Sequence, residues 1–291
     1  SSSDFEPLSD ILERGFEQIE TLFNNKGEVT GVGSGFKDLD DLTSGFQKGD
    51  MILIAARPSM GKTTFALNIA EHAALREGKS VVIFSLEMSK EQLAYKLLCS
   101  EANVDMLKLR TGNLEDKDWE NIARASGPLS SAKIYIDDTA GVSIMEMRSK
   151  CRRLKIEYGI DLILIDYLQL MSGSGEESRQ QEVSEISRNI KAIAKEMQCP
   201  VIALSQLSRA PEQRADHRPM LSDLRESGSI EQDADLVMFL YRDEYYNKET
   251  EEKNVAECII AKQRNGPVGN VKLAWIGQFS KFGNLEHNYR E

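Results

Sequence analysis

"MILIAARPSMGKTTFALN", residues 51–68, is the stretch that decides the fold class of this chain. An apolar run of strand character leads directly into the loop "RPSMG" and then into a helical stretch. A strand, a loop and a helix in this order form a phosphate cradle with the pattern G-x-x-x-x-G-K-[ST]. Ala56 stands where this pattern has glycine, but a methyl group is tolerated there if the backbone keeps β geometry. We therefore expect the segment to bind a nucleotide.

The cradle residues have separate expected roles. Backbone N–H groups of the loop and the positive end of the helix dipole face the phosphates. Lys62 is expected to contact the β- and γ-phosphates, and the Thr63 hydroxyl to bind Mg²⁺. Gly61 lets the backbone approach the phosphates without a Cβ. ATP and Mg²⁺ are the predicted cofactors. The predicted nucleotide-binding residues are Ser59, Met60, Gly61, Lys62, Thr63 and Thr64.

Three polar side chains at the ends of later strands are candidates for the chemistry of hydrolysis, because open α/β sheets bind ligands at the carboxyl ends of their strands. Asp166 closes "LILID" and is expected to hold Mg²⁺ from a strand beside the cradle strand. Glu87 ends "VVIFSLE" and is the candidate that orients and polarises the attacking water, the alternative being a helix-capping acid. Gln206 ends "VIALSQ", and its amide is expected to sense the γ-phosphate.

Apolar runs of strand character alternate with helical stretches from residue 50 onward. Strands are predicted at 51–56, 80–87, 133–138, 161–171, 200–207, 234–242, 255–264 and 270–277. Helices are predicted at 62–76, 89–100, 115–126, 143–158 and 180–197. Strands that are apolar on both faces and separated by helices predict an α/β fold with a mostly parallel, twisted sheet flanked by helices. The last three strands have no helix between them, which predicts an antiparallel edge.

An amphipathic helix is predicted before this domain. Apolar residues recur at helical spacing over residues 8–23, and the polar, glycine-bearing "NNKGEVTGVGSG" then interrupts the pattern. The sequence therefore divides into a linker helix, residues 1–25, and a main domain, residues 26–291. The apolar stripe packs either on its own domain or on a neighbouring chain, and the tether between them is long enough for both.

Composition excludes several classes of protein. The 291 residues carry a formal net charge of −11, so nucleic acid can bind only through a local basic loop or groove. No apolar run approaches the length of a membrane span, and the start lacks the pattern of a signal peptide, so we expect no membrane partner. The four cysteines form no C-x-x-C pair, so buried free thiols are expected rather than disulfides or a metal site.

Six segments taken together resemble the motor domain of DnaB-type replicative DNA helicases. They are "ARPSMGKTTFALNIA", "SLEMS", "LILIDYLQLM", "ALSQLSR", "LRESGSIEQDAD" and "AKQRNGPVG". The cradle and "LILID" occur throughout RecA-like ATPases, whereas the ordered set is specific to this family. The likeness covers residues 26–291, and the initial helix resembles the interdomain linker of the family. That family also accepts alanine or glycine at the position of Ala56.

The resemblance implies a RecA-like P-loop NTPase core that assembles into a homo-hexameric ring. Such a ring moves 5′ to 3′ along single-stranded DNA and separates the duplex at replication forks. The nucleotide then lies between subunits, where Arg264 matches the arginine finger of the family and Lys262 the accompanying lysine. Primase, bound through an N-terminal domain absent from this sequence, and a helicase loader are the implied partners. The implied location is the bacterial cytoplasm, in association with the nucleoid.

Two segments that follow the candidate catalytic strands could contact DNA. Residues 172–182 follow the strand of Asp166, and residues 208–229 follow Gln206 and carry several arginines in an otherwise acidic chain. Residue 209 is one of these arginines, and such a loop can track DNA phosphates. Ordinary mobile surface loops are the alternative. The resemblance implies that Arg225, Glu226 and Gly228 contact the DNA backbone, with Arg209 as a further candidate.

Two other functions are alternatives, of which the first shares the RecA-like core and the second belongs to another class. A strand-exchange recombinase polymerises as a filament on DNA, and a nucleotide-gated scaffold uses ATP only to set its oligomeric state. A forked duplex with a 5′ single-stranded tail separates these possibilities, since a helicase unwinds it, a recombinase pairs strands and a scaffold ignores it.

Overall fold

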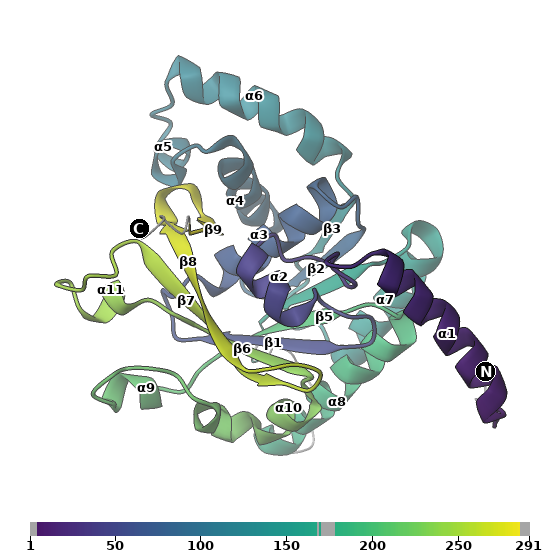
Figure 1. Cartoon of the computed structure of the whole chain (residues 1–291). Helices are drawn as coiled ribbons and strands as arrows, with labels where there is room; N and C mark the ends of the chain where they lie inside the picture. Colours follow the sequence, from purple (N-terminus) through teal and green to yellow (C-terminus); the bar gives the residue numbers. More distant parts are fainter. Residues whose placement is uncertain (1–4, 168, 170–177, 286–291) are drawn as a thin grey trace, which may run out of the picture.

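A nine-stranded mixed sheet runs through the protein, as a computed structural model describes for residues 5–167, 169 and 178–285 (Figure 1). Its strand order is β3-β2-β4-β5-β1-β6-β7-β8-β9. The strands are β1 (Met51–Ala56), β2 (Val81–Ser85), β3 (Ile134–Asp137), β4 (Leu162–Asp166), β5 (Val201–Gln206), β6 (Leu236–Tyr241), β7 (Val255–Gln263), β8 (Gly269–Ile276) and β9 (Lys281–Asn284).

Strands β1 to β6 pair in parallel, whereas β7, β8 and β9 pair antiparallel and form one edge. The predicted α/β fold with an antiparallel edge is confirmed, but with two corrections. β6 belongs to the parallel part, beside β1, and the edge gains β9, which the sequence did not predict. β9 is only four residues long and buries a single apolar side chain, Phe282, so it leaves no apolar period to detect.

Helices cover both faces of the sheet, as predicted (Figure 1). The long ones are α1 (Leu8–Asn24), α3 (Lys62–Leu75), α4 (Lys90–Ala102), α6 (Asp116–Ser131), α7 (Ile144–Tyr158) and α8 (Arg179–Met197). The short ones are α2 (Lys37–Thr43), α5 (Met106–Thr111), α9 (Ala210–Gln213), α10 (Gly228–Asp233), α11 (Asp243–Tyr246), and the 3₁₀ turns η2 (Leu221–Ser227) and η3 (Gly277–Phe279). The predicted helix at 115–126 was too short, since α6 continues through Pro128 to Ser131.

The central strand β1 is buried on both faces. Its residues alternate between two core clusters, because successive side chains of a strand point to opposite faces of the sheet. Ile52 and Ile54 join the cluster under α3, and Leu53 joins the cluster under α7 and α8. All six residues of β1 are buried, which explains why the strand reads as a continuous apolar run.

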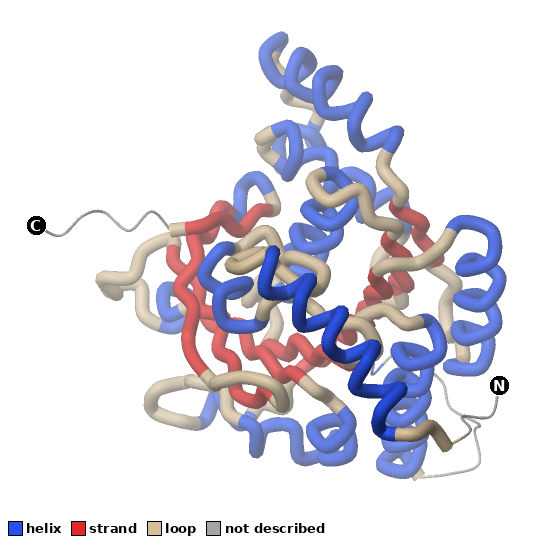
Figure 2. The backbone as a smooth tube through the Cα atoms, turned by 45° about the vertical axis from the view of Figure 1, so that its right-hand side comes forward, coloured by secondary structure: helices blue, strands red, loops and turns tan. Residues whose placement is uncertain are grey.

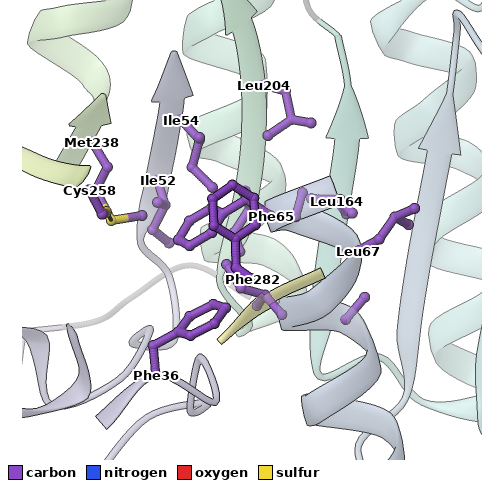
Figure 3. Packing of buried hydrophobic residues seen from close by; sticks show 14 of the residues in the cluster. Phe36, Ile52, Ile54, Phe65, Leu67, Leu164, Leu204, Met238, Cys258 and Phe282 are labelled. Carbon is purple, nitrogen blue, oxygen red and sulfur yellow. Dashed lines mark hydrogen bonds between the residues drawn. The ribbon is translucent and has the colours of Figure 1, made fainter. Parts of the chain in front are cut away.

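Aromatic side chains fix α3 to the elements around it. Figure 3 shows Phe65 of α3 between Phe36, which precedes α2, and Phe282 of β9. The rings of Phe36 and Phe65 are stacked with centroids 5.2 Å apart, and the ring of Phe282 meets Phe65 edge-on at 5.3 Å. Both separations lie in the favourable range for aromatic pairs. The antiparallel edge is thus tied to the helix that follows the phosphate cradle.

The helix predicted over residues 8–23 is confirmed as α1, which lies at the periphery of the molecule (Figures 1 and 2). It has no buried residue, although it carries Leu8, Ile11, Leu12, Phe16, Ile19, Leu22 and Phe23. All seven of these side chains are exposed. Within the described part of the chain, no helix has both the length and the apolar character required to cross a bilayer.

Candidate active site

The phosphate cradle links the end of β1 to the start of α3. Gly61 is the N-cap of α3 and has φ of 88°, a left-handed conformation that favours glycine. A Cβ on Gly61 would lie 2.5 Å from the ring of Trp275, so the loop also needs glycine for packing. Met60 is buried beneath the loop, and Ser59 lies exposed on its outer side. The start of α3 thus lies directly behind the loop, and the N-terminus of a helix favours phosphates.

Lys62 lies in the first turn of α3 beside two carboxylates. Its Nζ lies 4.2 Å from the centroid of the Tyr167 ring, a cation–π contact that holds the side chain over the loop. Burial lowers the pKa of Lys62, and the negative charges of Asp166 and Glu87 oppose this shift. Three of the predicted site residues are therefore within electrostatic range of one another.

Asp166, at the end of β4, has one bonded oxygen and one oxygen without a partner. The Thr63 hydroxyl donates to Asp166 Oδ2 at 2.9 Å. Oδ1 is buried and has no hydrogen-bond partner among the described residues. The residue is 2% exposed, and burial raises the pKa of its carboxyl against the charge of Lys62. Mg²⁺ prefers hard oxygen ligands, and the site offers the Thr63 hydroxyl and a carboxylate with one unsatisfied oxygen. These two residues therefore fit the ion.

The position of β4 corrects one expectation. β4 does not lie beside the cradle strand, because β5 is inserted between β1 and β4. Asp166 still reaches the cradle because the hydroxyl of Thr63, in the first turn of α3, donates a hydrogen bond to it. The strand predicted at 161–171 ends at Asp166, and residues 168, 170 and 171 lie outside the described part.

Glu87 follows β2 instead of ending it. β2 stops at Ser85, whose hydroxyl donates to Met88 O at 2.7 Å and accepts from Met88 N at 3.2 Å. This turn holds Glu87 exposed above the sheet, and the Leu86 amide donates to the carbonyl oxygen of Asp166 at 2.7 Å. The alternative of a helix-capping acid is wrong, since Ser89 caps α4.

Gln206 ends β5 beside Ala56, so its backbone lies directly next to the start of the cradle. Gln169 holds it in place, a role that the sequence did not suggest. The Gln169 amide nitrogen donates to Ser205 Oγ at 2.9 Å and to Gln206 O at 3.0 Å, and its oxygen accepts from Gln206 N at 3.2 Å. The backbone around Gln206 is therefore fixed from the β4 side.

Lys262 and Arg264 lie far from this cluster. β7 ends at Gln263 opposite the first residue of β6, which itself lies beside Ile52 near the start of β1. The cradle, in contrast, follows Ala56 at the end of β1. At about 3.3 Å of rise per residue, the two levels are more than ~13 Å apart along the sheet. Neither cation therefore belongs to the cradle of its own chain.

Both cations are held by contacts near the start of β6. Arg264 Nη1 donates to Asp235 Oδ1 at 3.1 Å, and Lys262 Nζ donates to the carbonyl oxygen of Glu231. Asp235 is buried, whereas the Arg264 side chain is 46% exposed. Burial, followed by the charge of Arg264, lowers the pKa of Lys262. The guanidinium of Arg264 is thus positioned at the surface by an acid behind it.

A sheet with a phosphate cradle at one end and a paired arginine at the other matches a known family along nearly the whole chain. The family model described as DnaB-like helicase C terminal domain matches residues 31–284. The chain belongs to this family. In this DnaB-like domain the predicted RecA-like core is confirmed, because solved members of the family superpose on it closely.

Similar proteins come from bacteria. The replicative DNA helicase DnaC of Bacillus subtilis (strain 168) is 59% identical over 99% of this chain and 64% of its own length. The replicative DNA helicase DnaB of Geobacillus stearothermophilus is 58% identical over 100% of this chain and 64% of its own length. This DnaB-like domain thus spans less than two thirds of these relatives.

Two solved structures are similar to the DnaB-like domain. One, described as an ATPase domain, superposes with a TM-score of 0.93, with 45% identity, over 97% of this chain and 100% of that one. A DnaB-like replicative helicase, described together with its interactions with primase, superposes with a TM-score of 0.89. That match has 45% identity and covers 98% of this chain and 68% of the other.

The candidate DNA segment of this DnaB-like domain is partly described. Arg209 is exposed and precedes α9. Arg225 and Glu226 lie in η2 and Gly228 begins α10, but the side chains of 225–228 are outside the described residues. Residues 172–177 of the other candidate segment are also outside them.

Two further arginines of that segment are held in ion pairs. Arg214 pairs with Asp223 at 2.5 Å, and Arg218 pairs with Glu257 at 2.9 Å. The first pair closes residues 214–223 on themselves, and the second ties them to β7. Composition could not show this, because the acidic partner of Arg218 lies on β7, far along the chain.

Two more residues of the DnaB-like domain were missed in the sequence. Lys96 on α4 is half-buried, its pKa is lowered by burial, and the charges of Asp166 and Glu87 oppose that shift. Arg242, which follows β6, donates from Nη1 to Ser59 O at 2.9 Å and stacks 4.3 Å from the Trp275 ring centroid. Lysines and arginines are common on surfaces, so no local signal separates these two from solvated charges.

The prediction that the four cysteines are buried free thiols is confirmed. Burial raises the pKa of Cys258, as of the other three, which makes them unreactive. The described residues also contain no cluster of His, Cys, Asp and Glu that could hold a metal ion by itself.

Proposed function

We propose that this domain is the ATP-driven motor of a replicative DNA helicase, which moves 5′ to 3′ on single-stranded DNA as a six-membered ring and separates the duplex at replication forks. The observation that carries the proposal is the polarity of the sheet. The carboxyl ends of its parallel strands lie near Lys62, Thr63, Asp166 and Glu87. Arg264 lies where these parallel strands begin. The names of the bacterial relatives, all replicative DNA helicases, support the same function.

In this proposal the cradle binds ATP and the acids prepare it for hydrolysis. Lys62 and the backbone of residues 59–64 hold the phosphates, while Thr63 and Asp166 bind Mg²⁺. The ion, when bound, neutralises charge on the β- and γ-phosphates. Glu87 accepts a hydrogen bond from the attacking water and takes its proton, for which its exposed carboxylate is suited. Gln206 lies next to the γ-phosphate and senses its loss.

A neighbouring copy completes the site. Arg264 and Lys262 face away from their own cradle, so they reach the γ-phosphate of the adjacent subunit, as the resemblance implies. Helix α1 supports this assembly, because its exposed apolar stripe needs a partner surface. Repeating one such head-to-tail contact closes a ring if the rotation between copies allows it.

DNA binds in the centre of the ring in this proposal. Arg209, Arg225, Glu226 and Gly228 lie in a segment that directly follows Gln206, so a change at the γ-phosphate moves them along the strand. Contacts to phosphates make the grip independent of sequence. Primase is a proposed partner because one similar structure is described with it. A helicase loader in the bacterial cytoplasm is the other proposed partner.

Unwinding of a forked duplex tests the proposed function. The chain, with ATP and Mg²⁺, should separate a fork that carries a 5′ single-stranded tail and leave a fork with only a 3′ tail intact. Its assembly mass, measured on the same sample, should be six times that of one copy. Strand pairing in place of unwinding would indicate a recombinase, and ATP turnover indifferent to DNA would indicate a scaffold.

A further inference from the structure

Arg57, which follows β1 and precedes the predicted nucleotide-binding residues 59–64, bonds to the segment that follows Gln206. Its Nη1 donates to the carbonyl oxygen of Leu207 at 2.8 Å, and its Nε donates to Glu212 Oε1 at 3.3 Å. The Arg57 side chain is 14% exposed. Its guanidinium is therefore committed to two acceptors on one segment, and it is not free to bind a nucleotide phosphate.

The acceptor side of this contact is itself fastened. Glu212 Oε1 also accepts from the Tyr246 hydroxyl at 3.1 Å. The Tyr246 ring stacks on His217, with centroids 4.4 Å apart and planes at 10°. His217 in turn shares a hydrogen bond with the carbonyl oxygen of Pro211 at 3.2 Å. Residues 207–217 and Tyr246 of α11 thus form one contact cluster, and Arg57 connects it to the loop after β1.

The backbone supplies a second connection at the same place. Leu207 N donates to Ala56 O at 3.1 Å, in continuation of the pairing between β5 and β1. The cradle and residues 207–217 therefore share a backbone bond and a side-chain clamp within two residues of each other. These two connections are the path by which a displacement of the cradle would reach residues 207–217.

We propose that Arg57 is a positioning residue that couples the nucleotide state of the cradle to the position of residues 207–217. Arg209 lies in that unit and is exposed, so its location then follows the nucleotide. The consequence for DNA rests on the proposed function above, whereas the coupling itself requires only that the cradle binds nucleotide.

Hydrogen exchange tests the coupling without DNA. In the native chain, the amides of 207–217 should be protected to different extents with a non-hydrolysable ATP analogue and with ADP. Arg57→Gln should remove this difference while both nucleotides still bind. A difference of unchanged size in Arg57→Gln would overturn the proposal. If that variant fails to fold, Arg57→Lys and Glu212→Gln carry the same test, because each breaks one bond of the clamp.

Turnover measurements connect the coupling to DNA. Arg57→Gln should keep the kcat without DNA and the KM for ATP, but lose about tenfold of the stimulation by a single-stranded oligonucleotide, as expected for a charged hydrogen bond. Arg57→Gln with Glu212→Gln should lose no more than either alone, since both act through one clamp. Arg148→Gln, which breaks the Arg148–Glu196 pair elsewhere, is the matched control.

The outcomes separate the two proposals. A raised KM for ATP with intact stimulation would show that Arg57 serves the nucleotide directly and would overturn the coupling. Additive losses in the double variant would also overturn it. Absence of DNA stimulation in the native chain would remove the proposed function, and a nucleotide-dependent exchange difference lost in Arg57→Gln would still support the coupling.

Discussion

Asp166 and Glu87 are two carboxylates of one site that lie in different environments. Asp166 is 2% exposed and bonded to Thr63, whereas Glu87 is exposed on a turn beyond β2. A buried carboxylate with one unsatisfied oxygen suits a metal ion, and an accessible one suits transfer of a proton from water. The two environments therefore support different proposed roles for two residues of similar chemistry.

The role of Glu87 leads to a prediction about turnover. Glu87→Gln should lower kcat for ATP hydrolysis by about 10²- to 10⁴-fold, the usual contribution of a general base. Binding of a fluorescent ATP analogue should be unchanged, because the phosphates are held by the cradle. Glu91→Gln, an exposed residue in the first turn of α4, is the control. Normal turnover in Glu87→Gln would refute the assignment.

Glu71 on α3 is a buried acid outside the site, and it predicts a pH dependence of stability. One of its oxygens accepts from Ser100 Oγ at 2.9 Å, and the other has no partner among the described residues. Burial raises the pKa of Glu71 to about 7. The folded state then holds a proton that the unfolded state releases near 4.5, so this contribution is full at acid pH and is lost as pH rises toward 7.

Replacing Glu71 by a neutral isostere should remove that loss. Glu71→Gln should leave the free energy of unfolding unchanged near pH 4.5 and raise it at pH 8 by about 1–3 kcal/mol, since one pKa unit corresponds to ~1.4 kcal/mol. Urea unfolding at the two pH values measures this, with the exposed Glu120→Gln as control. Equal effects at both pH values would show that the shifted carboxyl is not the cause.

At the scale of elements, local order in the chain decided what the sequence could predict. The cradle was predictable because β1, its loop and α3 follow one another in the sequence. All residues of the cradle therefore lie in one short stretch of the chain. Strand order was not, because the insertion of β5 between β1 and β4 depends on pairing between distant segments. The contacts of Arg57 with Glu212 and of Arg218 with Glu257 were missed for the same reason. Short elements such as α2 and β9 are too brief for an apolar period.

Helix α1 allows a prediction about assembly. Because none of its residues is buried, Phe16→Asp should change the free energy of unfolding by less than about 0.5 kcal/mol, as for a surface substitution. The same change should lower the mass of the assembly measured by light scattering, since a charge then replaces an apolar contact with a neighbour. Glu20→Gln on the same helix is the control. A large drop in stability would place the helix on its own domain.

At the scale of the whole molecule, the cradle and the proposed arginine finger lie at opposite ends of one sheet. Lys62 follows β1 at its carboxyl end, while Arg264 follows β7 at the level where β1 begins. A single copy can therefore offer a cradle on one side and a finger on the other, but it cannot join them. In the proposed function, hydrolysis therefore takes place at contacts between copies.

Mixing two inactive variants should restore activity. Arg264→Ala keeps its cradle and Lys62→Ala keeps its finger, so a contact that joins the first cradle to the second finger is complete. In an equal mixture about one quarter of contacts have this arrangement if copies assemble at random. DNA-stimulated turnover of the mixture should exceed that of either variant alone. A simple average of the two would show that each site is contained in one copy.

The polarity of the sheet also has an arithmetic consequence for loading onto DNA. An open row of n copies contains n−1 shared sites and leaves a bare cradle at one end and an unused arginine at the other. Closure joins these two ends and adds the last site. In the proposed ring, opening one contact between copies to admit a DNA strand would therefore inactivate only one hydrolysis site. The other sites would still hydrolyse ATP while the ring is open.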